Sequence, residues 1–379
     1  MDKNRLLLYF TVFLIMGLSN AVIPVLPEIA ASGEDSAGVL ASGLLFSGYF
    51  IGALVMMMPF GLLSDRYDGL RLIVFSILLT LVSGIVLLVS ENLFVLVLAR
   101  LTEGVACGAF FPVAYAMLSE YEEKSRYIGE FNFLLNAGLA LGVALAGYLA
   151  QWHIKGGIFI FTALAILLLI AGAMILKQDN RSHETSPKMR VKEPDIPGVR
   201  IIAGHFTNAK YSRIWIITFL LFGISGVVIA FYPDYSQEIL SKTELGISIA
   251  AMYVSAMIAN IAAGRLDLNY RQMIRAGIAI AATGTLLTIV HPLSGFALIG
   301  AGSGTGMVGL PLAVTNMRIQ RGLAMGIFNT CIYAGIGLMP VFAGVFLGIL
   351  GFEAIFAACA IILLLSLLIK DRLKSESYN

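Results

Sequence analysis

Charged side chains are scarce in this chain of 379 residues. Lys, Arg, Asp and Glu make up 13% of it, whereas hydrophobic residues make up 59% and the mean hydropathy is +0.89. Soluble globular domains carry about 25% charged residues, so this composition excludes a soluble protein. The formal net charge of +2 gives no indication of nucleic-acid binding. The composition predicts an integral membrane protein, with the lipid bilayer as its surroundings.

Cysteine and histidine are also rare, and their spacing indicates neither a metal site nor a disulfide framework. Cys107, Cys331 and Cys359 fall within expected apolar helices and are interpreted as small packing residues. The four histidines lie in or beside expected loops without metal-ligand spacing, and no Ser/His/Asp grouping or phosphate-binding motif occurs. We therefore expect no enzyme activity, no cofactor, no metal and no direct use of ATP.

Long apolar runs fill most of the chain. A transmembrane helix needs about 20 mostly apolar residues. Twelve such segments are expected, at 6–28, 37–62, 71–90, 93–118, 128–150, 155–176, 212–232, 245–263, 272–290, 293–315, 321–348 and 352–369. These runs are continuous, whereas membrane β-strands would alternate. The first run is long enough to span and has no small-residue cleavage pattern, so we expect a membrane helix there and no cleavable signal peptide.

Basic residues set the expected orientation, because Lys and Arg near helix ends are retained on the cytoplasmic side. Residues 6–65 contain no Lys or Arg. With both termini in the cytoplasm, 22 of the 25 basic residues fall in cytoplasmic segments. Lys155 and Lys242 then lie outside, and Arg100 lies within a helix. We expect a multi-pass protein of the plasma membrane with both termini cytoplasmic.

The second half of the chain repeats the first. The first and seventh segments share the pattern Phe-Leu-x-x-Gly-x-Ser-x-x-Val-Ile-x-x-x-Pro followed by an acid, at an offset of 206 residues. The fifth and eleventh match at an offset of 197. A polar stretch at 177–211 separates the copies. The repeat predicts two six-helix bundles, residues 1–176 and 212–379, joined by a cytoplasmic linker at 177–211.

The loop between the second and third segments reads Gly61-Leu-Leu-Ser-Asp65-Arg66-Tyr-Asp68-Gly69-Leu-Arg71. It resembles the G-x-x-x-D-R-x-x-G-x-R signature that joins helices 2 and 3 of major facilitator transporters. The resemblance implies an all-α membrane fold of twelve helices in two pseudo-symmetric six-helix halves, with the substrate bound near the midplane between them.

The same resemblance implies an inner gate at this loop. Asp65 would face the positive N-terminal end of helix 11, and Arg66 or Arg71 would pair with Glu120 at the cytoplasmic end of helix 4. The glycines permit tight turns and close helix approach. The predicted gate residues are Gly61, Asp65, Arg66, Gly69, Arg71 and Glu120. The alternative is a charged turn that only fixes topology.

The fourth segment contains the only carboxylate expected near the middle of a helix. Its sequence Arg100-Leu-Thr-Glu103-Gly104-Val-Ala-Cys107-Gly108 resembles the R-x-x-Q-G-x-G pattern of proton-coupled family members, with Glu103 in place of the glutamine. Arg100 and Glu103 share one helix face. Charge inside a bilayer is costly and marks a functional group by default, so Arg100 and Glu103 are the predicted proton-coupling residues. The alternative is a static ion pair that ties this helix into its bundle.

Polar side chains within the apolar segments are candidates to line the substrate path, because they are costly unless they face a cavity or a partner. They are Asn20, Tyr49, Asn132, Asn136, Tyr253, Asn260, Asn329 and Tyr333. Asn132 and Asn329 occupy equivalent repeat positions. The alternative for each is a hydrogen bond between helices.

Across the whole chain, the motifs resemble the drug:proton antiporter branch of the family, although Val143 stands where that branch carries a proline in helix 5. The resemblance implies a monomeric secondary transporter whose partners are protons and a small amphipathic or cationic substrate that it exports by alternating access. One alternative is a dedicated transporter of a sugar, an amino acid or a metal chelate without proton coupling. A transport-inactive sensor of the same fold is the other.

Overall fold

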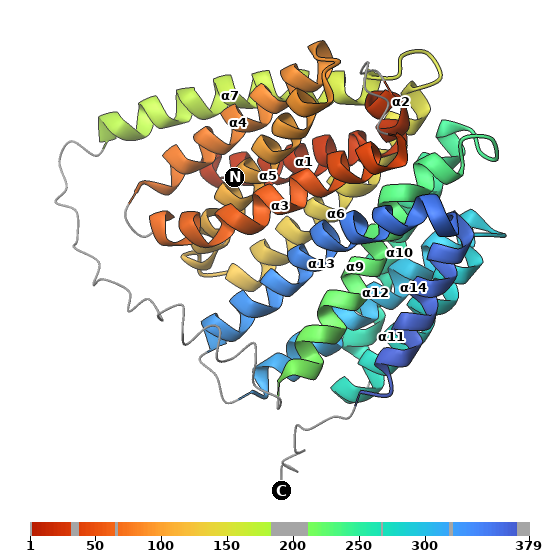
Figure 1. Cartoon of the computed structure of the whole chain (residues 1–379). Helices are drawn as coiled ribbons and strands as arrows, with labels where there is room; N and C mark the ends of the chain where they lie inside the picture. Colours follow the sequence, from red (N-terminus) through yellow and green to blue (C-terminus); the bar gives the residue numbers. More distant parts are fainter. Residues whose placement is uncertain are drawn as a thin grey trace, which may run out of the picture. The chain divides into compact units, whose positions relative to one another are not determined.

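The described chain is helical. The computed structural model describes residues 2–31, 38–64, 67–182, 211–266, 268–317 and 321–369, and none of these residues forms a β-strand. Figure 1 shows the helices, which are α1 (Lys3–Ala21), the 3₁₀ turn η1 (Ile23–Val25), α2 (Leu26–Ala31), α3 (Gly38–Ser64), α4 (Gly69–Val89), α5 (Leu93–Ser119), α6 (Lys124–Leu149), α7 (Gly156–Ser182), α9 (Ser212–Tyr235), α10 (Lys242–Arg265), α11 (Tyr270–Leu287), α12 (Pro292–Thr315), α13 (Arg321–Leu350) and α14 (Phe352–Ser366).

Each of the twelve predicted segments overlaps a helix or, for the first, a helix pair. Within the described ranges, ten helical segments are long and apolar enough to cross a membrane. The two remaining predicted segments overlap α11 and α14. The helix α14 is shorter, and the first turns of α11 carry Arg271 and Arg275. The protein is therefore a multi-pass membrane protein, and the number of twelve spans stays a prediction.

Local sequence signals explain several helix boundaries. Asp68 caps α4 by accepting a hydrogen bond from the Leu70 amide at 3.1 Å, and Asn92 caps α5 through the Val95 amide. These short polar side chains satisfy amide groups that have no partner inside the helix. Gly351 precedes α14 with a φ of 78°, a conformation that glycine adopts without a Cβ penalty.

Prolines interrupt the first membrane segment near its C-terminal end. Pro24 lies in η1 and Pro27 in the first turn of α2, so α1 ends at Ala21 and a short second helix follows. Proline lacks the amide that would continue a helix. The break places Glu28 in the first turn of α2.

The described helices fall into two compact units by contacts, each taken here by itself. The first unit contains residues 1–192 and 229–254. In it α3 and α4 pack on α5, α1 packs on α6 and α7, and α4 packs on α7. Aromatic rings fill the interior, with Phe110 and Phe131 stacked at 5.9 Å between ring centroids. Large apolar side chains such as Phe94 and Phe159 are exposed, as expected for lipid-facing surfaces.

The second unit contains residues 193–228 and 255–379. Its described part is centred on α11, which packs against α12 and α14, while α13 contacts α12 and α14. Phe296, Phe328 and Phe356 are fully buried there. Because residues 229–254 group with the first unit, these boundaries differ from the halves expected from the repeat, and the division at 177–211 stays a prediction.

Candidate functional site

A buried ion pair lies in the first half of α5. The Arg100 Nη1 atom is 2.5 Å from the Glu103 Oε2 atom, and the two side chains are 1% and 0% exposed. The guanidinium also donates from Nε to the Leu45 carbonyl oxygen of α3 at 3.0 Å and lies 5.1 Å from the ring centroid of Tyr49. The Arg100 charge is thus balanced by a carboxylate on its own helix and anchored to the backbone of a neighbouring one.

Glycines bring the backbones of α3 and α5 close enough for this contact. A Cβ atom at Gly104 would overlap the carbonyl oxygen of Tyr49, and one at Gly52 would overlap the carbonyl oxygen of Leu101. Small residues allow such close approach between membrane helices. The two helices therefore form a tight pair, and the arginine spans the short gap between them.

The two oxygens of the Glu103 carboxylate have different surroundings. Glu103 Oε1 is buried without a hydrogen bond of ordinary geometry among the described residues, and the Ser83 hydroxyl, which donates to the Ala99 carbonyl, also acts on the carboxyl. An ionised oxygen buried without a hydrogen bond is costly, whereas a protonated carboxyl loses much of that cost. Glu103 is therefore suited to take up a proton at Oε1, although the Arg100 charge favours the ionised form of this carboxyl.

The predicted cavity residues of the first unit make hydrogen bonds between helices and within α6. Asn20 donates from Nδ2 to the Leu139 carbonyl of α6 at 2.9 Å, and its side chain also bonds the Tyr253 hydroxyl. Asn132 accepts a hydrogen bond from Tyr115 at 2.8 Å, and Asn136 donates to the Asn132 carbonyl at 2.9 Å. The first unit thus brings Asn20 and Tyr253 together, and Asn132 and Asn136 together, while Tyr49 is held at the Arg100 site.

The predicted cavity residues of the second unit lie on two helices. Asn329 and Tyr333 are four residues apart on α13 and share a face, and Asn260 lies on α10. All three are partly buried. Sequence reasoning missed Ser225 and Ser303, whose hydroxyls lie 3.2 Å apart between α9 and α12.

The predicted inner-gate residues lie at helix ends where they are described. Gly61 is in the last turn of α3, Gly69 begins α4, and Glu120 follows the last residue of α5. A Cβ atom at Gly69 would approach the Met117 sulfur to 3.0 Å, which explains the glycine by close packing against α5.

The structure describes only some of the charged residues of the predicted inner gate. Arg71 pairs with Asp68 at 3.6 Å, one turn away on its own helix. Asp65 and Arg66 lie outside the described residues, so the proposed partner of Asp65 at the start of α13 stays a prediction.

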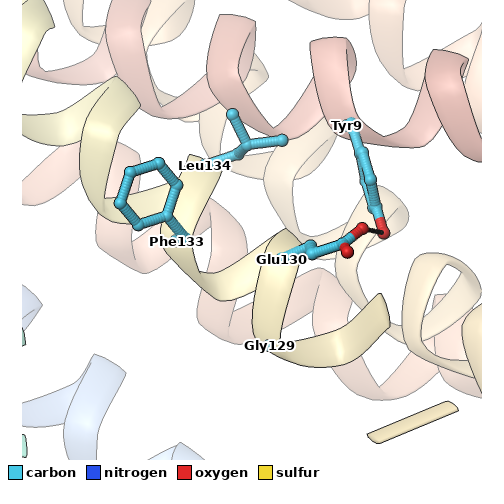
Figure 2. A pocket seen from close by; sticks show the side chains of 5 residues that line it. All are labelled: Tyr9, Gly129, Glu130, Phe133 and Leu134. Atoms are coloured by element: carbon cyan, nitrogen blue, oxygen red, sulfur yellow. Dashed lines mark hydrogen bonds between the residues drawn. The ribbon is translucent and has the colours of Figure 1, made fainter. Parts of the chain in front are cut away.

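A surface pocket between α1 and α6 was not expected from the sequence. It is lined by Tyr9, Gly129, Glu130, Phe133 and Leu134 (Figure 2). The Tyr9 hydroxyl donates to Glu130 Oε2 at 2.8 Å, as the dashed line in Figure 2 shows. Arg126 donates to the other oxygen at 3.0 Å, so the carboxylate is already balanced within the pocket wall.

Comparison with known proteins identifies the family. The family model described as Major Facilitator Superfamily matches residues 8–238 and 214–377. The chain belongs to this superfamily. This match confirms the resemblance that the loop signature indicated.

Curated relatives of this major facilitator protein are distant. The quinolone resistance protein NorA of Staphylococcus aureus is 26% identical over 203 residues, which are 52% of this chain and 50% of NorA. The chain thus spans about half the length of the first curated relatives that it matches. An uncharacterized MFS-type transporter of Methanocaldococcus jannaschii is 26% identical over 375 residues, 95% of each chain.

Solved structures share the fold at low sequence identity. The nucleoside transporter NupG, solved as a point mutant, has a TM-score of 0.76 and 13% identity, covering 96% of this chain and 98% of NupG. The human organic anion transporter MFSD10 has a TM-score of 0.66 and 16% identity, covering 97% and 99%. At such identities the likeness concerns the major facilitator fold alone.

Proposed function

We propose that this protein is a proton-coupled secondary transporter that exports a small amphipathic or cationic compound by alternating access. The observation that carries the proposal is the ion pair of Arg100 and Glu103, buried within an apolar helix of a major facilitator protein. The partial similarity to NorA, a quinolone resistance protein, agrees with export of a drug-like compound.

The proposed mechanism uses the Oε1 atom of Glu103. In the described state the carboxylate is sealed from solvent, and Arg100 holds its other oxygen. Exposure of this part of α5 to water during the transport cycle would let Glu103 take up a proton and release the Arg100 charge. Proton binding shifts the conformational equilibrium only by its differential affinity for the two states.

The remaining parts of the proposal follow from the sequence. The candidate path-lining residues are Asn20, Tyr49, Asn132, Asn136, Tyr253, Asn260, Asn329 and Tyr333. The protein acts as a monomer in the plasma membrane with both termini in the cytoplasm. Its partners are protons and the small-molecule substrate.

Transport driven by a pH gradient tests the proton-coupling role. Proteoliposomes with the Glu103→Gln variant should lose gradient-driven movement of a fluorescent lipophilic cation, because the amide cannot exchange a proton, while keeping part of the substrate exchange without a gradient. Glu122→Gln is the matched control, since Glu122 is exposed beyond the end of α5. Unchanged gradient-driven transport in Glu103→Gln would show that Glu103 is not the proton-coupling residue.

A dedicated metabolite transporter without proton coupling is the second candidate. The burial of the Arg100–Glu103 pair favours this candidate. The two side chains are 1% and 0% exposed and balance each other in charge, as expected for an ion pair that only holds helices together. A thermal-shift screen with lipophilic cations, nucleosides, organic anions, sugars and amino acids separates the candidates, because ligands of the folded state raise its apparent stability.

A further inference from the structure

A buried serine of α4 faces the turn of α5 that carries Glu103. The Ser83 side chain is fully buried, and its hydroxyl donates to the Ala99 carbonyl oxygen of α5 at 2.8 Å. Ala99 and Glu103 are four residues apart and therefore lie on one face of α5. The same hydroxyl also acts on the Glu103 carboxyl. Two groups of the neighbouring helix thus compete for one hydroxyl, a backbone carbonyl and a carboxylate.

The other buried hydroxyls of α4 differ from Ser83. Ser76 and Thr80 are also fully buried, but each donates to a carbonyl oxygen of its own helix one turn earlier, at 2.9 Å. Such local bonds are a common way in which a helix satisfies a serine or threonine hydroxyl. Ser83 instead bonds across to α5, beside the ion pair, so its contact is specific to this place in the bundle.

Close packing on α7 limits movement of the α4 backbone at this point. A Cβ atom at Gly84, the residue after Ser83, would overlap the Thr162 hydroxyl of α7. Thr162 is itself held by a hydrogen bond to the Ile158 carbonyl at 2.7 Å. Rotation of the Ser83 side chain between its staggered positions is therefore the simplest way to redirect the hydroxyl.

The Ala99 carbonyl does not depend on the serine. In an α-helix the carbonyl of Ala99 accepts a hydrogen bond from the amide of Glu103, four residues later. A carbonyl oxygen has two lone pairs, so it keeps this bond when the Ser83 hydroxyl turns away. Such a turn leaves no buried carbonyl unpaired, and its cost is small.

Glu103 Oε1 is the carboxylate oxygen that remains for the Ser83 hydroxyl. Arg100 holds Oε2 and is the charged group that acts on the carboxyl, and Tyr49 of α3 is the titratable group beside Arg100. A hydroxyl can donate to an ionised carboxylate and accept from a protonated one. Because hydrogen bonds to an ionised acceptor are stronger than those to a neutral one, ionised Glu103 attracts the hydroxyl more than the Ala99 carbonyl does.

We propose that Ser83 is a positioning residue that reads the protonation state of Glu103. When Glu103 is ionised, the Ser83 hydroxyl turns and donates to Oε1. When Oε1 takes up a proton, the new O–H donates to the Ser83 oxygen, and the Ser83 hydrogen returns to the Ala99 carbonyl. The serine stays neutral throughout, and only its hydroxyl rotates. The inference rests on the proposed function, in which Glu103 takes up a proton, and it links that proton to the contact between α4 and α5.

Infrared difference spectroscopy of the purified protein tests this hydrogen bond without substrate or a proton gradient. The carboxyl C=O band of protonated Glu103 is the band that Glu103→Gln removes from acid-minus-neutral spectra. Ser83→Ala should shift this band to higher frequency, because the protonated carboxyl loses a hydrogen bond. Ser83→Thr keeps the hydroxyl and should restore the parent frequency. Ser76→Ala removes a buried hydroxyl of the same helix, bonded to the Leu72 carbonyl, and should leave the band unchanged.

Transport in proteoliposomes gives the second readout. Ser83→Ala should lower gradient-driven movement of a fluorescent lipophilic cation roughly tenfold, as expected for loss of a hydrogen bond to a charged group, and should keep its exchange without a gradient. Size-exclusion profiles and melting temperatures identify any variant that fails to fold.

The two readouts separate the role of Ser83 from the proposed function. A folded Ser83→Ala protein with the parent band frequency would overturn the role of Ser83, whatever its transport rate. The absence of any band that Glu103→Gln removes would overturn it as well. A shifted band in Ser83→Ala, together with gradient-driven transport that survives in Glu103→Gln, would support the hydrogen bond and overturn the proposed function.

Discussion

Arg100 and Glu103 form an ion pair whose cost and role depend on its burial. Two charges removed from water lose hydration, and their attraction repays this loss only when the geometry and hydrogen bonds are favourable. Arg100 has a carboxylate and a backbone carbonyl as acceptors, whereas one Glu103 oxygen has no hydrogen bond of ordinary geometry in the described chain. The pair is therefore incompletely stabilised, as expected of a group that changes its protonation during a cycle.

Single and double replacements measure what the pair contributes to stability. Glu103→Leu should lower the free energy of unfolding by about 3–5 kcal/mol, because it leaves the Arg100 charge buried alone. Arg100→Leu combined with Glu103→Leu should recover most of this loss, since it removes both charges. Melting temperatures of the purified variants give the comparison. A double variant as unstable as the single one would mean that the arginine acts mainly through the Leu45 carbonyl.

Lys155 is a second unusual cation, located in the short connection before α7. Its Nζ atom donates to the carbonyl oxygens of Leu88 and Ser90 at 3.1 and 3.2 Å, at the C-terminal end of α4. Burial lowers the pKa of Lys155 below its usual value, and the Glu91 carboxylate partly offsets this effect. The lysine satisfies carbonyl groups that the helix end leaves unpaired.

The lowered pKa of Lys155 predicts a pH dependence of stability. Between the lowered pKa of the folded state and the ordinary lysine pKa, the unfolded chain binds more protons at this residue, so stability rises with pH through that window. Lys155→Met should remove this rise, and Lys177→Met, at an exposed lysine, should keep it. Thermal unfolding from about pH 8 to 11, a range that brackets the ordinary lysine pKa, provides the measurement. Parallel pH profiles of the parent and Lys155→Met proteins would contradict the linkage.

At the scale of elements, the α3–α5 pair is held at short range by glycines. Close backbone contact increases van der Waals packing between membrane helices, where the hydrophobic effect supplies little attraction. The carbonyl oxygen of Tyr49 occupies the space that a side chain at position 104 would need. Because this obstacle is backbone, it cannot rotate away as a side chain could.

A pair of glycine replacements separates close packing from helix propensity. Gly104→Ala should destabilise the protein by roughly 1–3 kcal/mol through overpacking. Gly129→Ala, in α6 of the same unit, meets open space and should instead stabilise by about 0.5–1 kcal/mol through higher helix propensity. Melting temperatures that move in the same direction for both variants would show that packing at Gly104 is not limiting.

The helices themselves were predictable from the sequence, whereas most contacts between them were not. Length and apolarity located the predicted segments, and the spacing of three residues placed Arg100 and Glu103 on one face. The partners of individual residues on other helices could not be predicted, such as Leu45 for Arg100, Tyr115 for Asn132 and Lys242 for Glu28. Helices that are apolar on every side carry little periodicity to indicate which faces meet, so pairing between helices depends on packing that sequence spacing does not encode.

For the whole molecule, the inner loop predicts a shift of the conformational equilibrium. Asp65→Asn should weaken closure of the inner gate and raise the inward-open population, since the amide loses the attraction to a helix N-terminus. The variant shifts the equilibrium only as far as the lost contact distinguishes the two states. Spin-label distances give the populations, and an unaltered distribution in Asp65→Asn would count against the inner gate.

Tryptophan placement gives the packing of α6 an optical consequence. The chain has two tryptophans: Trp215 is 3% exposed within α9, while Trp152 is 60% exposed at the end of α6, beside the hydrogen bond between Gln151 and Thr243 of α10. Separation of α10 from α6 would change the surroundings of Trp152 and leave those of Trp215 within its helix. The intrinsic fluorescence of the protein should therefore report such a separation in real time, and a Trp152→Phe variant should lose that signal.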